Sequence, residues 1–248
     1  YKCEIHFSTG SNTARSSSNF YALNNGIATL FEIRGVGIGK TSFKRRINSG
    51  LAVGFSFLKT AFENSNFIFN QIDVANTNTN DIVLQHERSI YTDVIKVIDI
   101  ESNELIDFTT TMHSSKDSYA ISKRDRPLAY IIKKNNYGFI DKLDDVGVKY
   151  VEFERDTMIY SGGYKVVEFN NNFKVYEKMK MQKVVTSIEY SNNKFSKGDI
   201  LISMSQKRSN LIAELLEPEA PNSYVSFGII KTSLNKQLPI YRIKNFNN

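Results

Sequence analysis

The sequence has 248 residues, of which 41% are hydrophobic and 12% aromatic, so it suits one large or two modest folded domains. This composition excludes disorder as the default state. The 32 Lys and Arg residues exceed the 26 Asp and Glu residues, giving a formal net charge of +6. The excess is dispersed and accompanies no recognisable nucleic-acid module, which argues for a solvated basic face and against a nucleic-acid partner.

The single cysteine, Cys3, excludes an internal disulfide. That favours a reducing compartment only weakly, since many exported bacterial proteins also lack disulfides. No apolar run reaches the length of a transmembrane span. The sequence opens with Tyr1 rather than Met, so we expect it to begin inside a longer gene product or after processing.

In chain order, the pattern predicts a strand over residues 2–7, a polar loop over 8–18 and a turn or short helix near 20–23. A β-branched and aromatic run over 27–32 predicts a second strand, which ends at Glu32. Arg34 and three alternate glycines follow it. A carboxylate on a rigid strand end, beside an arginine and a flexible loop, is a plausible general base. The alternative is an ordinary Glu32–Arg34 ion pair at a sheet end.

A helix of about six turns is predicted from residue 43, because apolar residues recur at spacings of three and four. This apolar stripe comprises Phe43, Ile47, Leu51, Phe55, Leu58 and Phe62. The asparagine-rich stretch 64–80 marks a boundary and includes a possible short helix near 67–74.

Beyond this boundary the pattern is mostly of strands. Strands are predicted over 82–84, 94–100, 105–111, 127–132, 148–153, 164–169, 173–181, 184–190, 200–204 and 224–230. Residues 101–103 form a predicted hairpin turn, and 114–125 a surface loop. Two short helices are predicted, over 136–145 with Gly147 as the C-cap, and over 209–216.

Common catalytic motifs are incomplete. Gly39-Lys40-Thr41 matches the end of a phosphate-binding loop, but Arg34 replaces its leading glycine. The three histidines, His6, His86 and His113, lie in no zinc-binding spacing. No serine lies in a Gly-x-Ser-x-Gly elbow.

Several motifs, taken in order, resemble the closing segment of a zinc carboxypeptidase catalytic domain, the family of carboxypeptidase A, followed by the accessory C-terminal region of bacterial members. The motifs that carry this resemblance are 19–25, 31–35, 43–47, 126–132, 147–150 and 215–223. In that family a Phe-Glu-Leu-Arg-like strand end carries the catalytic glutamate, and a long helix closes the domain.

The resemblance implies that Glu32 is the general base, taking a proton from a zinc-bound water and passing it to the leaving amine. Arg34 would have an electrostatic or orienting role at the substrate. Tyr21 matches an aromatic residue before the strand. His6 would stand where the family has its mobile substrate tyrosine. The family's zinc ligands, a His-x-x-Glu pair and a later His, do not occur here.

We therefore expect an α/β fragment, the end of a zinc carboxypeptidase domain, over residues 1–66, a linker or short helix over 67–80 and a β-rich α+β accessory domain over 81–248. The expected parent enzyme binds zinc through residues outside this chain and hydrolyses a peptide or amide bond next to a free carboxylate. Its expected partners are a peptide or cell-wall-derived peptide and the missing N-terminal part. The expected location is periplasmic or secreted. The alternative is a non-enzymatic β-rich binding module retained from such an enzyme.

Overall fold

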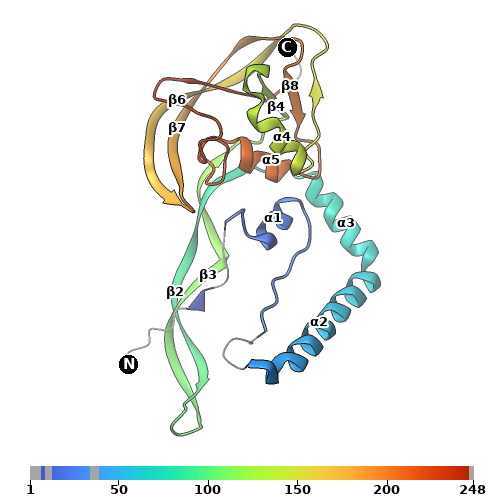
Figure 1. The fold of residues 1–248 in the computed structure, drawn as a ribbon, viewed down its shortest axis with the longest axis vertical. Coiled ribbons are helices and arrows are strands. Elements are labelled where there is room, and N and C mark those ends of the chain that lie inside the picture. The colour runs from blue at the N-terminus through green and yellow to red at the C-terminus, as the bar shows by residue number, and fades with distance from the viewer. Residues whose placement is uncertain (1–6, 9–12, 34–38, 246–248) are drawn as a thin grey trace.

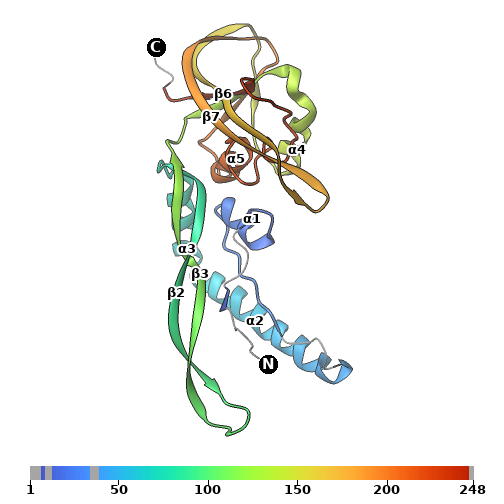
Figure 2. The same ribbon diagram turned by 90° about the vertical axis from the view of Figure 1, so that its left-hand side faces the viewer.

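The computed structural model describes residues 7–8, 13–33 and 39–245, which form a mixed α/β structure with a large β-rich portion. A β-rich head occupies one end of the molecule, and a long hairpin with three helices extends from it (Figures 1 and 2). No described helix is long and apolar enough to cross a membrane.

The described strands form two sheets. The first has the order β1-β3-β2, with β1 at Phe7–Ser8, β2 at Ile82–Ile98 and β3 at Leu105–Arg124. The second has the order β5-β8-β4-β9-β6-β7. Its strands are β4 (Ala129–Ile132), β5 (Val151–Glu152), β6 (Thr157–Tyr176), β7 (Met179–Phe195), β8 (Ile200–Ser203) and β9 (Gln237–Ile243).

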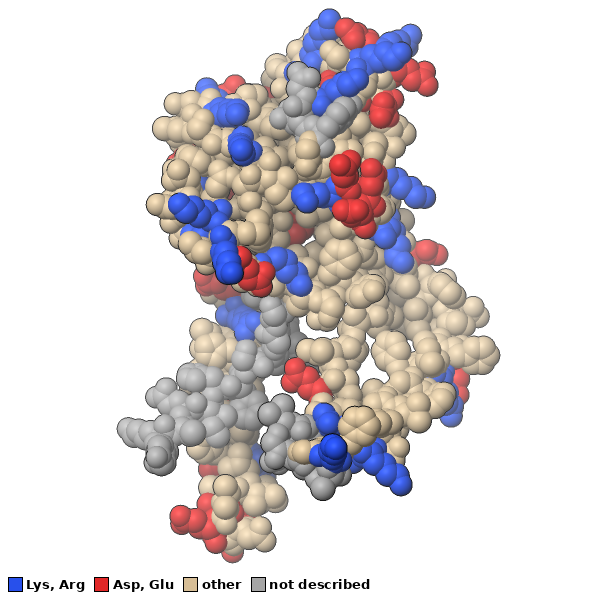
Figure 3. Space-filling view, in the orientation of Figure 1, with Lys and Arg blue, Asp and Glu red and all other residues tan. Residues whose placement is uncertain are grey.

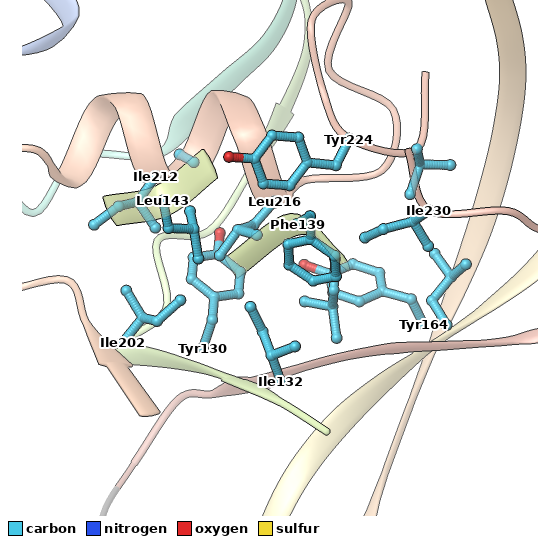
Figure 4. Packing of buried hydrophobic residues seen from close by; sticks show 14 of the residues in the cluster. Tyr130, Ile132, Phe139, Leu143, Tyr164, Ile202, Ile212, Leu216, Tyr224 and Ile230 are labelled. Carbon is cyan, nitrogen blue, oxygen red and sulfur yellow. The ribbon is translucent and has the colours of Figure 1, made fainter. Parts of the chain in front are cut away.

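The core of the head lies between the second sheet and two short helices, α4 (Ile140–Asp145) and α5 (Ser209–Leu216). All four residues of β4 are buried because β8 and β9 pair with it on either side. Figure 4 shows Tyr130, Tyr164 and Ile202 from the sheet meeting Leu143 and Leu216 from the helices. The predicted helix over 209–216 is confirmed, and the one over 136–145 begins as a 3-10 turn, η2 (Lys134–Phe139).

Two predictions were wrong at the boundaries of strands, one in the hairpin and one in the head. The predicted loop over 114–125 belongs mostly to β3, which continues to Arg124 opposite Ile82. The predicted strand over 173–181 contains the β6–β7 turn, where Glu177 and Lys178 both have positive φ (47° and 68°). Such turns usually carry glycine or asparagine, so this one has a weak sequence signal.

Residues 224–230, predicted as a strand, form turns, whereas β9 was not predicted. Tyr224 and Ile230 gave a strand-like apolar pattern, but they fill the core from a turn. The Ile230 N–H closes this turn by donating to the Tyr224 carbonyl (2.9 Å). Pro239 within β9 lacks a backbone donor and lowers the strand signal there.

The helical arm consists of α1 (Ser17–Leu23), the 3-10 turn η1 (Gly39–Ser42), α2 (Phe43–Glu63) and α3 (Ser65–Asn76). Both long helices were predicted, yet neither contains a buried residue. Their apolar side chains are exposed, and the surface over them is largely tan in Figure 3, apart from a group of basic side chains at the start of α2.

The predicted strand over 27–32 was wrong for this structure: residues 26–33 are assigned to no helix or strand and pair with no other described strand. The segment runs beside α2, since a Cβ at Gly50 would lie 3.9 Å from Ile33 Cδ1. Ile27 faces the α2–α3 corner from the same segment.

Candidate functional site

Glu32 lies in the unpaired segment 26–33, next to the N-terminal half of α2. Its side chain is exposed, and the neighbouring Leu30 and Phe31 are 65% and 52% exposed. An apolar strand sequence that pairs with no described strand is typical of a strand whose sheet neighbours lie outside the chain. The carboxylate is thus accessible, but no described group orients it.

Of the other predicted site residues only Tyr21 is described, and no described contact joins it to Glu32. Tyr21 lies on α1, is 59% exposed and contacts the Phe20 ring edge-on at 6.2 Å. Its carbonyl accepts from the N–H groups of Asn24 and Gly26, which closes the turn after α1. Arg34 and His6 lie outside the described residues.

An apolar groove lies beside this segment. It has a volume of about 490 Å³ and is bounded by Ile27, α2 and α3. The helix residues that line it are Val53, Ser56, Phe57, Thr60, Ala61, Ile68 and Ile72. A largely apolar concave surface of this size is typical of a site covered by another segment or a ligand.

The described residues also provide no group of three His, Cys, Asp or Glu side chains that could hold a metal ion. The part of the chain that the structure describes therefore does not fit a resident zinc ion. Zinc ligands, if the complete protein has them, lie elsewhere.

A different cluster of charged groups lies inside the head and was not predicted. The Glu217 side chain is fully buried; its Oε1 accepts hydrogen bonds from the hydroxyls of Tyr130 (2.5 Å) and Tyr164 (2.8 Å). Its Oε2 accepts from Arg124 Nη1 at 2.6 Å. Arg124 Nη2 pairs with Glu219, whose Oε1 accepts from the backbone N–H (2.7 Å) and hydroxyl (2.8 Å) of Thr186.

Burial, reinforced by the charge of Glu217, raises the pKa of Tyr130 and of Tyr164 well above the ordinary tyrosine value. Both phenols are therefore protonated donors. Groups with shifted pKa values often mark active sites. Here, however, both oxygens of the Glu217 carboxylate already accept hydrogen bonds from the protein, so the cluster acts as a structural anchor. The sequence signal was present in the motif 215–223, which contains both glutamates.

Comparison with known proteins gives a consistent set of relatives. The chain is similar to fungal proteins named carboxypeptidase 2. It is 30% identical over 240 residues to that of Trichophyton equinum, covering 93% of this chain and 44% of the relative. It is 28% identical over 235 residues to that of Trichophyton tonsurans and 29% identical over 242 residues to that of Trichophyton rubrum, with the same coverage.

The chain thus spans less than half the length of the curated relatives it matches. No family model matches it, and no solved structure matches it significantly. The relatives support the carboxypeptidase-like resemblance of the sequence. Their names do not mention zinc, and because they are fungal they give no support to a bacterial origin.

Proposed function

We propose that this chain is the C-terminal portion of a zinc-dependent carboxypeptidase that hydrolyses a peptide or amide bond next to a free carboxylate. The similarity to proteins named carboxypeptidase 2 supports this proposal. The observation that carries it in the structure is the unpaired apolar segment 26–33 beside α2 and α3, whose exposed apolar faces require cover.

In this proposal residues 1–66 complete an α/β domain together with polypeptide outside the chain, and residues 81–248 form an accessory β-rich unit. The segment 26–33 joins a sheet, and the α2 and α3 residues that line the apolar groove pack on it. Formation of that sheet would give the backbone of 27–33 strand partners and bury Leu30 or Phe31. The same pairing would fix Glu32 at a strand end.

Glu32 acts in this proposal as the general base. Its carboxylate accepts a proton from the water that attacks the substrate carbonyl and delivers it to the leaving amine. Arg34, two residues on, supplies a positive charge that orients the substrate or stabilises the developing oxyanion. Tyr21 and His6 are the further substrate-facing residues. Zinc would come with ligands outside the described residues, and the proposed location is periplasmic or secreted.

The experiment compares the complete protein with its Glu32→Gln variant. Zinc content is measured first, and hydrolysis of peptides with free and amidated C-termini is then followed. We expect cleavage only of the free-carboxylate peptides and a loss of kcat of at least about a hundredfold in Glu32→Gln, with unchanged zinc content. Glu63→Gln, an exposed glutamate of α2, is the matched control.

Full turnover in Glu32→Gln would show that Glu32 is not the general base. A complete protein with neither bound zinc nor turnover would instead favour the non-enzymatic binding module.

A further inference from the structure

A small aromatic pocket lies on the head, at the end of β9. It has a volume of about 240 Å³ and is lined by Tyr160, Tyr190, Lys244 and Asn245. The rings of Tyr160 and Tyr190 are stacked, with centroids 6.0 Å apart and planes inclined by 28°. Tyr160 is 46% exposed, so part of its ring is available to a ligand.

The sheet fixes the orientation of Tyr190. Tyr190 on β7 is the cross-strand partner of Gly162 on β6, which is in turn the partner of Arg242 on β9. Because Gly162 has no side chain, the Tyr190 ring lies over its Cα: a Cβ there would be 2.8 Å from the ring. Cross-strand partners project from the same face of a sheet, so Tyr190 leans toward Arg242.

Polar groups surround the rings. The Lys244 ammonium lies 5.2 Å from the centroid of the Tyr190 ring and 3.2 Å from the carboxylate of Asp125. The same carboxylate lies 3.5 Å from Nη2 of the fully buried Arg242. Among the described residues, Nε and Nη1 of the buried Arg242 have no hydrogen-bond partner. The pocket thus joins an apolar ring face to several polar groups.

The charge and size of the pocket limit its ligand. Lys244 is already paired with Asp125, so among the described residues that line this pocket no isolated cation calls for an anionic ligand. The volume of about 240 Å³ is below the ~300–1,000 Å³ typical of pockets that enclose a drug-sized ligand. The pocket therefore fits one ring-sized unit with an apolar face and a polar edge.

We propose that this pocket binds one ring of a neutral carbohydrate chain. The axial C–H groups of a pyranose ring give it an apolar face that stacks on Tyr160, and its hydroxyls form hydrogen bonds with Lys244 and Asn245. A polymer would hold further rings outside the pocket. The site is separate from Glu32, so its binding is independent of hydrolysis.

The test uses the purified full chain and a set of tetrasaccharides, namely β-1,4-glucan, β-1,3-glucan, β-1,4-N-acetylglucosamine, xylan and mannan oligomers. Binding is followed by tyrosine fluorescence, which no tryptophan obscures, and by calorimetry. Tyr160→Ala removes the stacking ring, Tyr160→Phe keeps it, and Tyr119→Ala is the control because Tyr119 is a similarly exposed tyrosine (54%) on the hairpin. N-acetyl-tyrosine and acetate serve as non-carbohydrate probes.

We expect at least one oligosaccharide to bind, with affinity about tenfold weaker in Tyr160→Ala and near wild type in Tyr160→Phe and Tyr119→Ala. Binding should persist at high salt because the ligand is neutral. The proposal is overturned if none of the tetrasaccharides binds, or if Tyr160→Ala binds them as well as the parent does. It is also overturned if only N-acetyl-tyrosine or acetate binds in a manner that depends on Tyr160. Circular dichroism of each variant checks that the variant is folded, so that weaker binding is not caused by unfolding.

Discussion

Arg124 Nη1 lies 2.6 Å from Glu217 Oε2, and this buried ion pair joins the last residue of β3 to the turn that follows α5. The contact connects the two parts of the molecule seen in Figure 1, the hairpin and the head. Glu219 and the hydroxyls of Tyr130 and Tyr164 complete the set of partners. A buried pair with this many hydrogen bonds fixes how the hairpin leaves the head.

Replacing Arg124 with alanine should strongly destabilise the head. It leaves the Glu217 carboxylate buried without its hydrogen-bonded counter-charge, and breaking such a pair costs about 3–5 kcal/mol. Chemical denaturation, followed by circular dichroism, measures the change in the free energy of unfolding. Lys96→Ala breaks the exposed Lys96–Asp107 pair of the same hairpin and should change stability little. Equal effects from the two substitutions would contradict the role of Glu217 as an anchor.

The same cluster predicts a pH dependence on the alkaline side. Burial raises the pKa of Tyr164 in the folded state above the unfolded value of about 10. The folded state therefore keeps a proton that the unfolded state loses, and stability falls as pH rises from the unfolded toward the folded pKa. Each such tyrosine contributes a slope of about 1.4 kcal/mol per pH unit in that window.

Tyr164→Phe should remove one such slope above pH ~10. The substitution also removes the hydrogen bond from Tyr164 to Glu217, and that loss lowers the free energy of unfolding at neutral pH. The test therefore compares how steeply the free energy of unfolding falls with pH, not its value at neutral pH. Unfolding curves at several alkaline pH values give both quantities. An unchanged slope would show that Tyr164 does not hold its proton through burial.

Gly162→Ala should destabilise the β6–β7 hairpin. The new Cβ would lie 2.6 Å from Ile188 Cγ2 and 2.8 Å from the Tyr190 ring, so packed side chains must shift. Overpacking of this kind costs about 1–3 kcal/mol. Gly138→Ala is the matched control, since nothing lies within 4 Å of its added Cβ. Thermal unfolding compares the two, and a neutral Gly162→Ala would contradict the packing of Tyr190 over β6.

Sequence reasoning worked where local pattern and tertiary environment agree. The apolar spacing predicted α2 and α5, and the positive φ of Gly147 (67°) matches its predicted role as a cap. It did not work where neighbours decide the structure. Segment 26–33 has strand residues but no partner strand among the described residues, and Tyr224, Val225 and Ile230 give a strand-like apolar pattern because they fill the core from a turn.

The candidate sites divide in the same way. Glu32 was predicted from its sequence context, and the structure shows where it lies. No described contact joins it to Tyr21. The Glu217 cluster and the Tyr160–Tyr190 pocket depend on pairings between distant strands, such as Gly162 with Arg242, which no local pattern reveals.

The exposed stripe of α2 gives a prediction that separates this chain from the complete protein. Phe55 and Leu58 are 64% and 65% exposed, so replacing both with serine should leave the stability of this chain nearly unchanged. If the remaining polypeptide covers the stripe, the same change should cost the complete protein about 1.5–3 kcal/mol for each side chain removed from its packing. Denaturation of both proteins, each with and without the double substitution, measures the difference. Lys59→Ser on the same helix is the control because its side chain is exposed and charged. A complete protein that tolerates the double substitution as well as the isolated chain would mean that the rest of the protein does not cover the exposed stripe of α2.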